Sequence, residues 1–267
     1  MGKYFAIFNL GLQNTVVYRW NFLFRTVAGL VPMLGGLYLW RALFYSRGGV
    51  EIEGWDYSGM VRYFLFIMLA ENLVTPIEDE WQIAADIRDG RLSSFLIRPF
   101  DYMLYRLSLF GSARLMYTAV AILPSAVLLW VYRADLRVPQ DAATWWLTGF
   151  SLIMSALLQF FISYALAMIA FWLLEISTIV FIVYSFEYFL SGRIFPLDLM
   201  PPVVRQVTEW LPFTYELYFP VSIFMERTQG PALARGLVIQ FLWLVVACGL
   251  ARLLWARGVQ RYQAVGG

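Results

Sequence analysis

The sequence predicts an all-α, polytopic membrane protein, with a single transmembrane domain over residues 1–267 and six transmembrane helices. Hydrophobic residues make up 61% of the chain and charged residues only 14%, whereas about a quarter of the residues in a soluble domain are charged. These charges are too few to cover a water-facing surface of this size. Six stretches are also apolar over the roughly 20 residues that a helix needs to cross a bilayer. Together these observations exclude a soluble enzyme.

Residues 1–20 are predicted to form a helix in the membrane interface. Aromatic and aliphatic residues are interrupted by Asn9, Gln13, Asn14 and Arg19, so the segment is too polar to span. It also lacks the small-residue cleavage pattern of a signal peptide. An interfacial helix accommodates this mixture of residues, and a simple lead-in to the first span is the alternative.

The spans are separated by polar or proline-containing breaks. The apolar sequence from Thr144 onward is too long for one span, and we divide it at the turn formed by residues 175–178. An even number of spans places both termini on the same side. Lys and Arg are almost evenly divided between the two sides, so the positive-inside rule does not identify that side. The expected spans are Phe22–Phe44, Tyr57–Ile77, Leu107–Tyr132, Thr144–Trp172, Ile176–Leu190 and Ala232–Trp255.

The loop over residues 78–106 contains a predicted short helix that ends at Gly90, since glycine favours the conformation that follows a helix. At 100° per residue, one face of this helix is acidic and the opposite face is apolar. We expect a protein partner to bind it, because anionic lipid would repel the acidic face. A helix that rests on the membrane surface is the alternative. The acidic face holds Glu78, Asp79, Gln82, Asp86 and Asp89, and the apolar face holds Trp81, Ile83, Ala84, Ile87 and the stem of Arg88.

Residues 191–230 combine prolines with many aromatic side chains. Prolines interrupt regular helices, and a high aromatic content is typical of the membrane interface. We therefore predict short helices that lie at the outer face or dip into it, with an ordinary extracellular loop as the alternative. The prolines are Pro196, Pro201, Pro202, Pro212 and Pro220, and the aromatic residues include Trp210, Phe213, Tyr215, Tyr218 and Phe219.

The order of these features resembles a known family. Residues 86–101 read Asp-Ile-Arg-Asp-Gly-Arg-Leu-Ser-Ser-Phe-Leu-Ile-Arg-Pro-Phe-Asp. This resembles the cytoplasmic loop of type-2 ATP-binding-cassette (ABC) transporter permeases, in which glycine, a basic residue and leucine lead to a leucine-rich run that ends in Arg-Pro. The resemblance covers nearly the whole chain. It continues at Ser191-Gly192 and Pro196, at Leu211-Pro212-Phe213 and Pro220, and in the tail from Arg261 to Gly267.

The resemblance implies a permease in the cell inner or plasma membrane, with both termini cytoplasmic and an outer re-entrant segment. The helix before Gly90 would then be a coupling helix that contacts a separate ATPase. Two ABC ATPase subunits and a second permease chain, identical or homologous, complete the implied complex, and membrane lipid surrounds it. The coupling residues implied are Trp81, Ile83, Asp86, Ile87, Arg88, Asp89, Gly90, Arg91, Arg98 and Pro99.

Several chemistries are excluded by what the chain lacks. A phosphate-binding loop needs a Gly-Lys-Ser or Gly-Lys-Thr step, but the sole lysine is Lys3. We therefore expect no cofactor in this chain and place ATP and Mg in the partner ATPase. The chain has no histidine and one cysteine, Cys248, which excludes histidine-based catalysis, a histidine zinc site and an internal disulfide. Basic and acidic residues nearly balance, so no nucleic-acid partner is expected.

Ionisable side chains within the spans are costly and are expected to be paired or functional. At 1.5 Å per residue, Arg62 and Glu187 lie at similar depth below the outer face, and Glu71 and Arg114 lie at similar depth above the inner face. We predict two ion pairs on this basis. These pairs either fix helix packing or line a polar vestibule.

The function predicted first is that of the membrane subunit of an ATP-driven exporter for a hydrophobic or amphipathic substrate such as a lipid, glycolipid or drug. The alternative is an ion-coupled secondary transporter or channel that uses Glu71 and Glu187, which would act without an ATPase. An intramembrane enzyme is nearly excluded, because the predicted spans contain no histidine, no metal-ligand cluster and no Ser-Lys pair.

Overall fold

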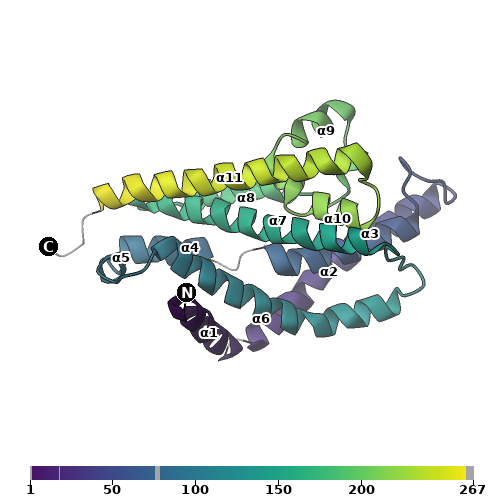
Figure 1. Cartoon of the computed structure of the whole chain (residues 1–267). Helices are drawn as coiled ribbons and strands as arrows, with labels where there is room; N and C mark the ends of the chain where they lie inside the picture. The colour runs from purple at the N-terminus through teal and green to yellow at the C-terminus, as the bar shows by residue number, and fades with distance from the viewer. Residues whose placement is uncertain (1, 18, 76–78, 263–267) are drawn as a thin grey trace.

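The computed structural model describes residues 2–17, 19–75 and 79–262, and this part of the chain is helical without a β-strand (Figure 1). The all-α prediction is confirmed. The predicted span end at Ile77, the loop start at Glu78 and the tail residues 263–267 lie outside the described residues. The elements are α1 (Gly2–Val17), α2 (Arg19–Ser46), α3 (Tyr57–Val74), α4 (Asp79–Arg88), α5 (Leu92–Leu96), α6 (Tyr102–Val131), α7 (Ala142–Met168), η1 (Ile169–Phe171), α8 (Ser177–Leu190), η2 (Leu197–Leu199), α9 (Pro202–Thr208), η3 (Pro212–Tyr215), α10 (Tyr218–Phe224) and α11 (Gly230–Arg261).

Five candidate membrane-spanning helices are present in the described ranges, formed by α2, α3, α6, α7 and α11. Each of them corresponds to a predicted span. The predicted fifth span is α8, an apolar helix of 14 residues. At 1.5 Å per residue it extends about 21 Å, which is less than the roughly 30 Å thickness of the hydrocarbon core. The count of six spans is therefore not confirmed.

Three of the long helices begin at an aspartate that caps them. The Asp56 carboxylate accepts a hydrogen bond from the Gly59 amide at 2.7 Å, and the Asp101 carboxylate accepts one from the Leu104 amide at 2.9 Å. Asp141 caps α7 in the same way. These side chains satisfy amide donors that have no partner within the helix, and so fix where α3, α6 and α7 begin.

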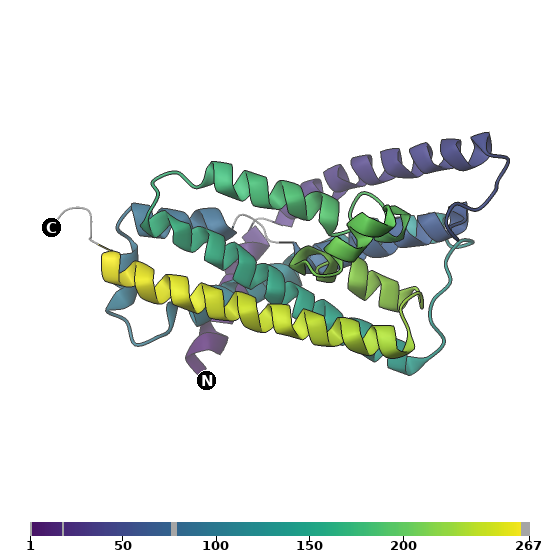
Figure 2. The same cartoon turned by 90° about the horizontal axis from the view of Figure 1, so that it is seen from above.

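The axes of the long helices lie roughly along the length of the bundle, and different segments gather at its two ends (Figures 1 and 2). We call one end the α5 end, where α4, α5 and the C-terminal part of α11 lie. The opposite end is the α9 end, where α9 projects from the bundle and α11 begins. Helix α1 packs along α6 in the same half as the α5 end.

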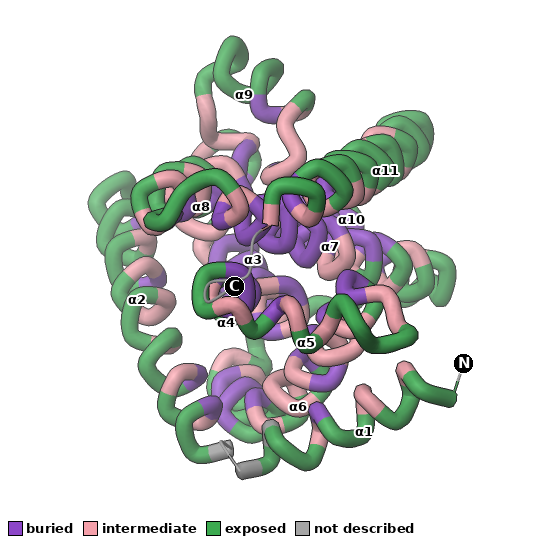
Figure 3. Tube along the Cα trace, turned by 90° about the vertical axis from the view of Figure 1, so that its left-hand side faces the viewer, coloured by how far each residue is buried: buried purple, intermediate pink, exposed green. Residues whose placement is uncertain are grey.

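The most deeply buried residues gather around α3, α7 and α10, whereas the outward sides of α2, α8 and α11 are exposed (Figure 3). Many of the exposed residues are large and apolar. Phe24 of α2 is 73% exposed, Phe181 of α8 is 72% exposed, and Trp146 of α7 is 80% exposed. Such a surface suits lipid or another membrane helix, and it would be unusual in a soluble protein.

Candidate functional site

The segment from α4 to the start of α6, residues 79–106, contains the predicted coupling residues. Ile83, Ala84 and Ile87 are 1%, 1% and 5% exposed, and they belong to the apolar core shared with α7. The expectation that the apolar face of this helix is free to anchor a partner is therefore wrong for Ile83 and Ile87. Both the membrane bundle and a partner could bury such a face, and periodicity alone does not distinguish between them.

Asp86 is also committed to contacts inside the chain. Its carboxylate is 9% exposed and pairs with the guanidinium of Arg106, and it accepts a hydrogen bond from the Tyr102 hydroxyl at 2.8 Å. The Nε of Arg106 donates to the same hydroxyl at 2.9 Å. The prediction that Asp86 belongs to a free acidic face is therefore wrong. This cluster instead connects α4 rigidly to the first turn of α6.

Further contacts fix the start of α6 against the rest of the bundle. The Tyr102 ring stacks on Trp255 of α11, with centroids 5.1 Å apart and planes at 10°. Arg252 of α11 pairs with Asp101, and Lys3 of α1 donates to the Pro99 carbonyl at 2.6 Å. Burial acts to raise the pKa of Asp101, but hydrogen bonds from Arg252 and from backbone amides outweigh it and hold the pKa below its usual value.

The side chains that remain exposed in residues 79–106 form a surface that we call the α5 surface. Its most exposed apolar member is Ile97, at 86%, next to Leu96 at 43%, and Trp81 is 36% exposed. Gly90 has φ +75° at the turn between α4 and α5, a conformation that glycine adopts without strain. The exposed members are Trp81, Gln82, Arg88, Asp89, Arg91, Ser94, Leu96, Ile97, Arg98, Pro99 and Leu104.

Both predicted intramembrane ion pairs are wrong. Arg62 donates to the Ser58 carbonyl at 3.4 Å, and the Glu187 carboxylate accepts from the Gln159 amide at 3.1 Å. Arg114 is 4% exposed and lies against the rings of Phe110 and Tyr117. Within the described residues none of its three nitrogens has a hydrogen-bond acceptor. Equal depth along two helices does not determine the direction in which their side chains point.

Glu71 pairs with Arg193, a residue that the sequence placed in the outer segment. The distance from Arg193 Nε to Glu71 Oε1 is 3.1 Å, and Arg193 also donates to the Thr75 hydroxyl at 3.1 Å. Thr75 caps the C-terminal end of α3, about 27 Å along that helix from Tyr57. Arg193 therefore lies deep in the bundle, at the level of the C-terminal end of α3. It reaches this level because α8 ends at Leu190, only three residues before Arg193.

A cavity of about 380 Å³ opens beside this ion pair. Its walls come from α2, α3, α6 and the chain at the end of α8. One part of the lining is apolar and the other part is charged. The apolar part includes Met33, Phe64, Ile67 and Met68, the charged part includes Arg25, Glu71 and Arg193, and Gly29, Pro32 and Gly36 form the α2 wall.

Residues 191–229 fold back against α3, α7 and α11. Gly192 has φ +83°, and its carbonyl accepts a short hydrogen bond from the Tyr63 hydroxyl, 2.5 Å away. A Cβ at Gly192 would lie 2.8 Å from Tyr218, so a larger residue does not fit. The other residues predicted here occupy helix starts and packed turns: Pro196 precedes η2, Pro212 and Phe213 belong to η3, and Pro220 is buried in α10.

The sequence interpretation missed the polar side chains that support this folded-back chain. The Tyr215 carbonyl accepts hydrogen bonds from Ser155 at 2.8 Å and from Gln240 at 2.9 Å. Gln240 is 0% exposed and also contacts Ser151. Irregular backbone is tolerated at membrane depth where neighbouring side chains satisfy it in this way. A lone glutamine in the apolar run of α11 was the available signal.

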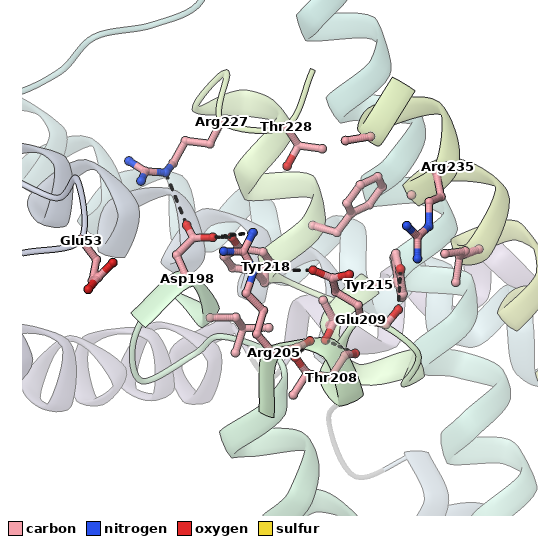
Figure 4. A pocket seen from close by; sticks show the side chains of 16 residues that line it. Glu53, Asp198, Arg205, Thr208, Glu209, Tyr215, Tyr218, Arg227, Thr228 and Arg235 are labelled. Atoms are coloured by element: carbon pink, nitrogen blue, oxygen red, sulfur yellow. Dashed lines mark hydrogen bonds and ion pairs between the residues drawn. The ribbon is translucent and has the colours of Figure 1, made fainter. Parts of the chain in front are cut away.

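A second cavity, of about 440 Å³, lies under α9 (Figure 4). Asp198 is one of its lining residues, and it accepts a hydrogen bond from the Tyr218 hydroxyl at 2.6 Å and pairs with Arg227 at 3.4 Å. Arg205 lies between Asp198 and Glu209, at 3.7 and 3.5 Å. The charges in this lining are therefore largely matched within the chain.

A comparison with known protein families identifies the family of this chain. Residues 30–266 match the model of a family described as ABC-2 family transporter protein. The chain belongs to the ABC-2 transporter family. No curated protein matches it.

The family match gives the described features a common setting. Members of the ABC-2 family are multi-pass membrane components of ABC transporters and associate with ABC ATPase subunits. This chain is accordingly a transport permease. The match begins within α2 and includes the segment from α4 to α6, the 440 Å³ cavity, most of the lining of the 380 Å³ cavity and the folded-back chain after α8.

Proposed function

We propose that this ABC-2 permease is the membrane-spanning subunit of an ATP-driven exporter. Two permease chains, identical or homologous, would form the pathway, and two separate ATPase subunits would bind ATP and Mg. The α5 end would face the cytoplasm in the inner or plasma membrane, and both termini would be cytoplasmic. The substrate would be a hydrophobic or amphipathic molecule such as a lipid, glycolipid or drug.

The observation that carries this proposal is the Asp86 cluster. ATP-driven movement of a partner affects the spans only if the contact between them is rigid and differs in free energy between two conformations. Asp86, Tyr102 and Arg106 connect α4 to α6, and Tyr102 stacks on Trp255 of α11. A movement of the α5 surface would therefore be transmitted to α6 and α11 through direct side-chain contacts and not through a flexible loop.

The ATPase contact is placed on the exposed α5 surface instead of the buried face of α4. Ile97 and Trp81 would supply apolar anchors, and Arg88 and Arg98 would supply charges. Trp81 and Arg91 also border a groove of about 370 Å³ over Asp86, which a side chain of the ATPase would enter.

The experiment that tests this contact replaces Ile97 with aspartate. Ile97 is 86% exposed, so the change leaves the core untouched, and we expect lost co-purification of the ATPase and lost coupling of hydrolysis to transport. Val50→Asp is the matched control, because Val50 is 65% exposed in the loop between α2 and α3, far along the chain from α5. If Ile97→Asp retained the ATPase as the Val50 variant does, the contact would lie elsewhere.

The 380 Å³ cavity supports an amphipathic substrate. Its volume falls in the usual range for small-molecule sites, and it places the Glu71–Arg193 pair next to apolar walls. A polar head group would meet the charged part of the lining while an apolar tail followed the methionine and phenylalanine side chains. Helix α2 lines one side of the cavity, and it would separate the cavity from lipid.

The alternative of an ion-coupled transporter that uses Glu71 and Glu187 is less well supported. Glu71 has Arg193 as its cation, so its carboxylate is not available as a bare cation ligand. Transport by the purified permease in the absence of any ATPase, driven by an ion gradient, would favour the alternative.

A further inference from the structure

Two glutamates lie deep in the bundle without a cation between them. Glu187 of α8 is 5% exposed, and Glu216, directly after η3, is 1% exposed. The chain on both sides of Glu216 lies against the end of α8. The Thr214 hydroxyl donates to the Thr208 carbonyl at 2.8 Å and lies 3.4 Å from the Leu190 carbonyl, and the Tyr218 amide donates to the Ser191 carbonyl at 2.9 Å. Glu216 therefore packs at the last turn of α8, where Glu187 lies.

The polar atoms around these carboxyl groups are incompletely paired. Within the described residues both carboxyl oxygens of Glu216 have no hydrogen-bond partner. Ser191 is 0% exposed and its hydroxyl has none either. Gln159 is 1% exposed and donates to Glu187, but the oxygen of the same amide group is unpaired. The unpaired oxygen of Gln159 can only accept a hydrogen bond, whereas the Ser191 hydroxyl can accept or donate one.

The charges facing the pair do not neutralise it. Arg193 is the cation that influences both carboxyl groups, and it is already paired with Glu71 at 3.1 Å. From α4, Glu80 adds a further acidic group near Glu187. An isolated carboxylate in a low-dielectric interior is so unfavourable that it takes up a proton, and two neighbouring carboxylates cannot both remain ionised.

We propose that Glu187 and Glu216 form a proton-binding site within the bundle, in which the pair holds at least one proton at neutral pH. The proton allows one carboxyl group to act as a hydrogen-bond donor, either to the other carboxylate or to the unpaired oxygen of Gln159. The two groups belong to different elements, α8 and the folded-back chain. A movement that separates these elements and admits water releases the proton.

Infrared spectroscopy of the permease reconstituted in lipid without an ATPase tests the site. The wild-type protein is expected to show, at pH 7, the C=O stretching band of a protonated carboxylic acid, which shifts in D₂O. An exposed glutamate, with a pKa of about 4.3, is ionised at that pH. The band is expected to be lost in the double variant Glu187→Gln/Glu216→Gln and unchanged in the exposed control Glu51→Gln. Because glutamine resembles the protonated acid in shape and charge, the double variant is expected to fold.

A missing band in wild-type protein, or a band that persists in the folded double variant, would overturn the site. The release of the proton on movement rests on the proposed function and is tested by a separate measurement. After reconstitution with the ATPase and trapping with a non-hydrolysable ATP analogue, the band is expected to weaken. An unchanged band in the trapped state would refute that link alone, because the first measurement needs no ATPase.

Discussion

Loss of the Asp86 carboxylate should destabilise the permease itself, beyond any effect on its partner. Replacement by alanine leaves the Arg106 guanidinium, which is 8% exposed, without its counter-charge, and removes the acceptor of the Tyr102 hydroxyl. Breaking a buried ion pair from one side costs about 3–5 kcal/mol. On the scale of soluble chains of similar size, at roughly 2–4 °C per kcal/mol, this lowers Tm by about 6–20 °C.

Asp89 provides the matched control for this change. It lies three residues further along the chain and pairs with Arg91 at 2.9 Å, but the side chains are 55% and 57% exposed. Exposed pairs contribute about 0–1 kcal/mol, so Asp89→Ala should shift Tm by no more than about 4 °C. The assay is thermal unfolding of the purified permease in detergent, followed by intrinsic fluorescence.

The double variant Asp86→Ala/Arg106→Met separates the ion pair from simple loss of packing. Removal of both charges leaves no unpaired buried ion, so the double variant should recover much of the stability lost in Asp86→Ala. If Asp86→Ala unfolded at the same temperature as Asp89→Ala, Asp86 would not be part of a rigid connection. The argument for force transmission through α4 would then fail.

Three further predictions concern the cavity, the topology and the folded-back chain. Gly29→Leu should fill the 380 Å³ cavity and lower transport severalfold. Gly35→Leu is the control, because Gly35 lies outside the cavity lining and both glycines have open space at the Cβ position. Equal transport by the two variants would exclude the cavity from the pathway. In a Cys248→Ser background, a cysteine at Val203 should react with a membrane-impermeant reagent from outside and one at Ile97 should not, and the reverse pattern would invert the topology. Gln240→Leu removes the amide hydrogen bonds to Ser151, Ser155 and the Tyr215 carbonyl, and should cost about 1–3 kcal/mol in thermal unfolding; an unchanged Tm would show that the folded-back chain does not depend on them.

The sequence predicted the long helices well because their signal is local. A run of apolar residues long enough to cross a bilayer is recognisable without its neighbours, and α6, α7 and α11 lie where such runs occur. Helix α8 was less predictable. Its apolar sequence continues to Leu190, but whether a helix of this length crosses the membrane depends on the chain that follows it.

The side-chain partners were less predictable, because they depend on the direction around each helix axis. The membrane depth estimated from the sequence paired Glu71 with Arg114. In the structure, Arg193, which follows the end of α8, pairs with Glu71 instead. The amphipathic pattern of α4 was correct, but its apolar face packs into this chain and its acidic face contains the buried Asp86. Periodicity identifies a face to be buried and does not identify what buries it.

Three charged groups of the bundle lie where α3 and α8 end, and this placement predicts where the permease moves. Glu71 is three residues before the end of α3, and Glu187 is three residues before the end of α8. Arg193 joins the two ends, and broken helices leave carbonyl groups that such side chains or water must satisfy. Rearrangement there disrupts fewer helical hydrogen bonds than rearrangement within α7 or α11, so we expect ATP binding by the partner to act at this junction. In hydrogen exchange, the amides of residues 191–194 should respond to a trapped ATPase while the middle of α7 stays protected, and a uniform response along both would contradict this expectation.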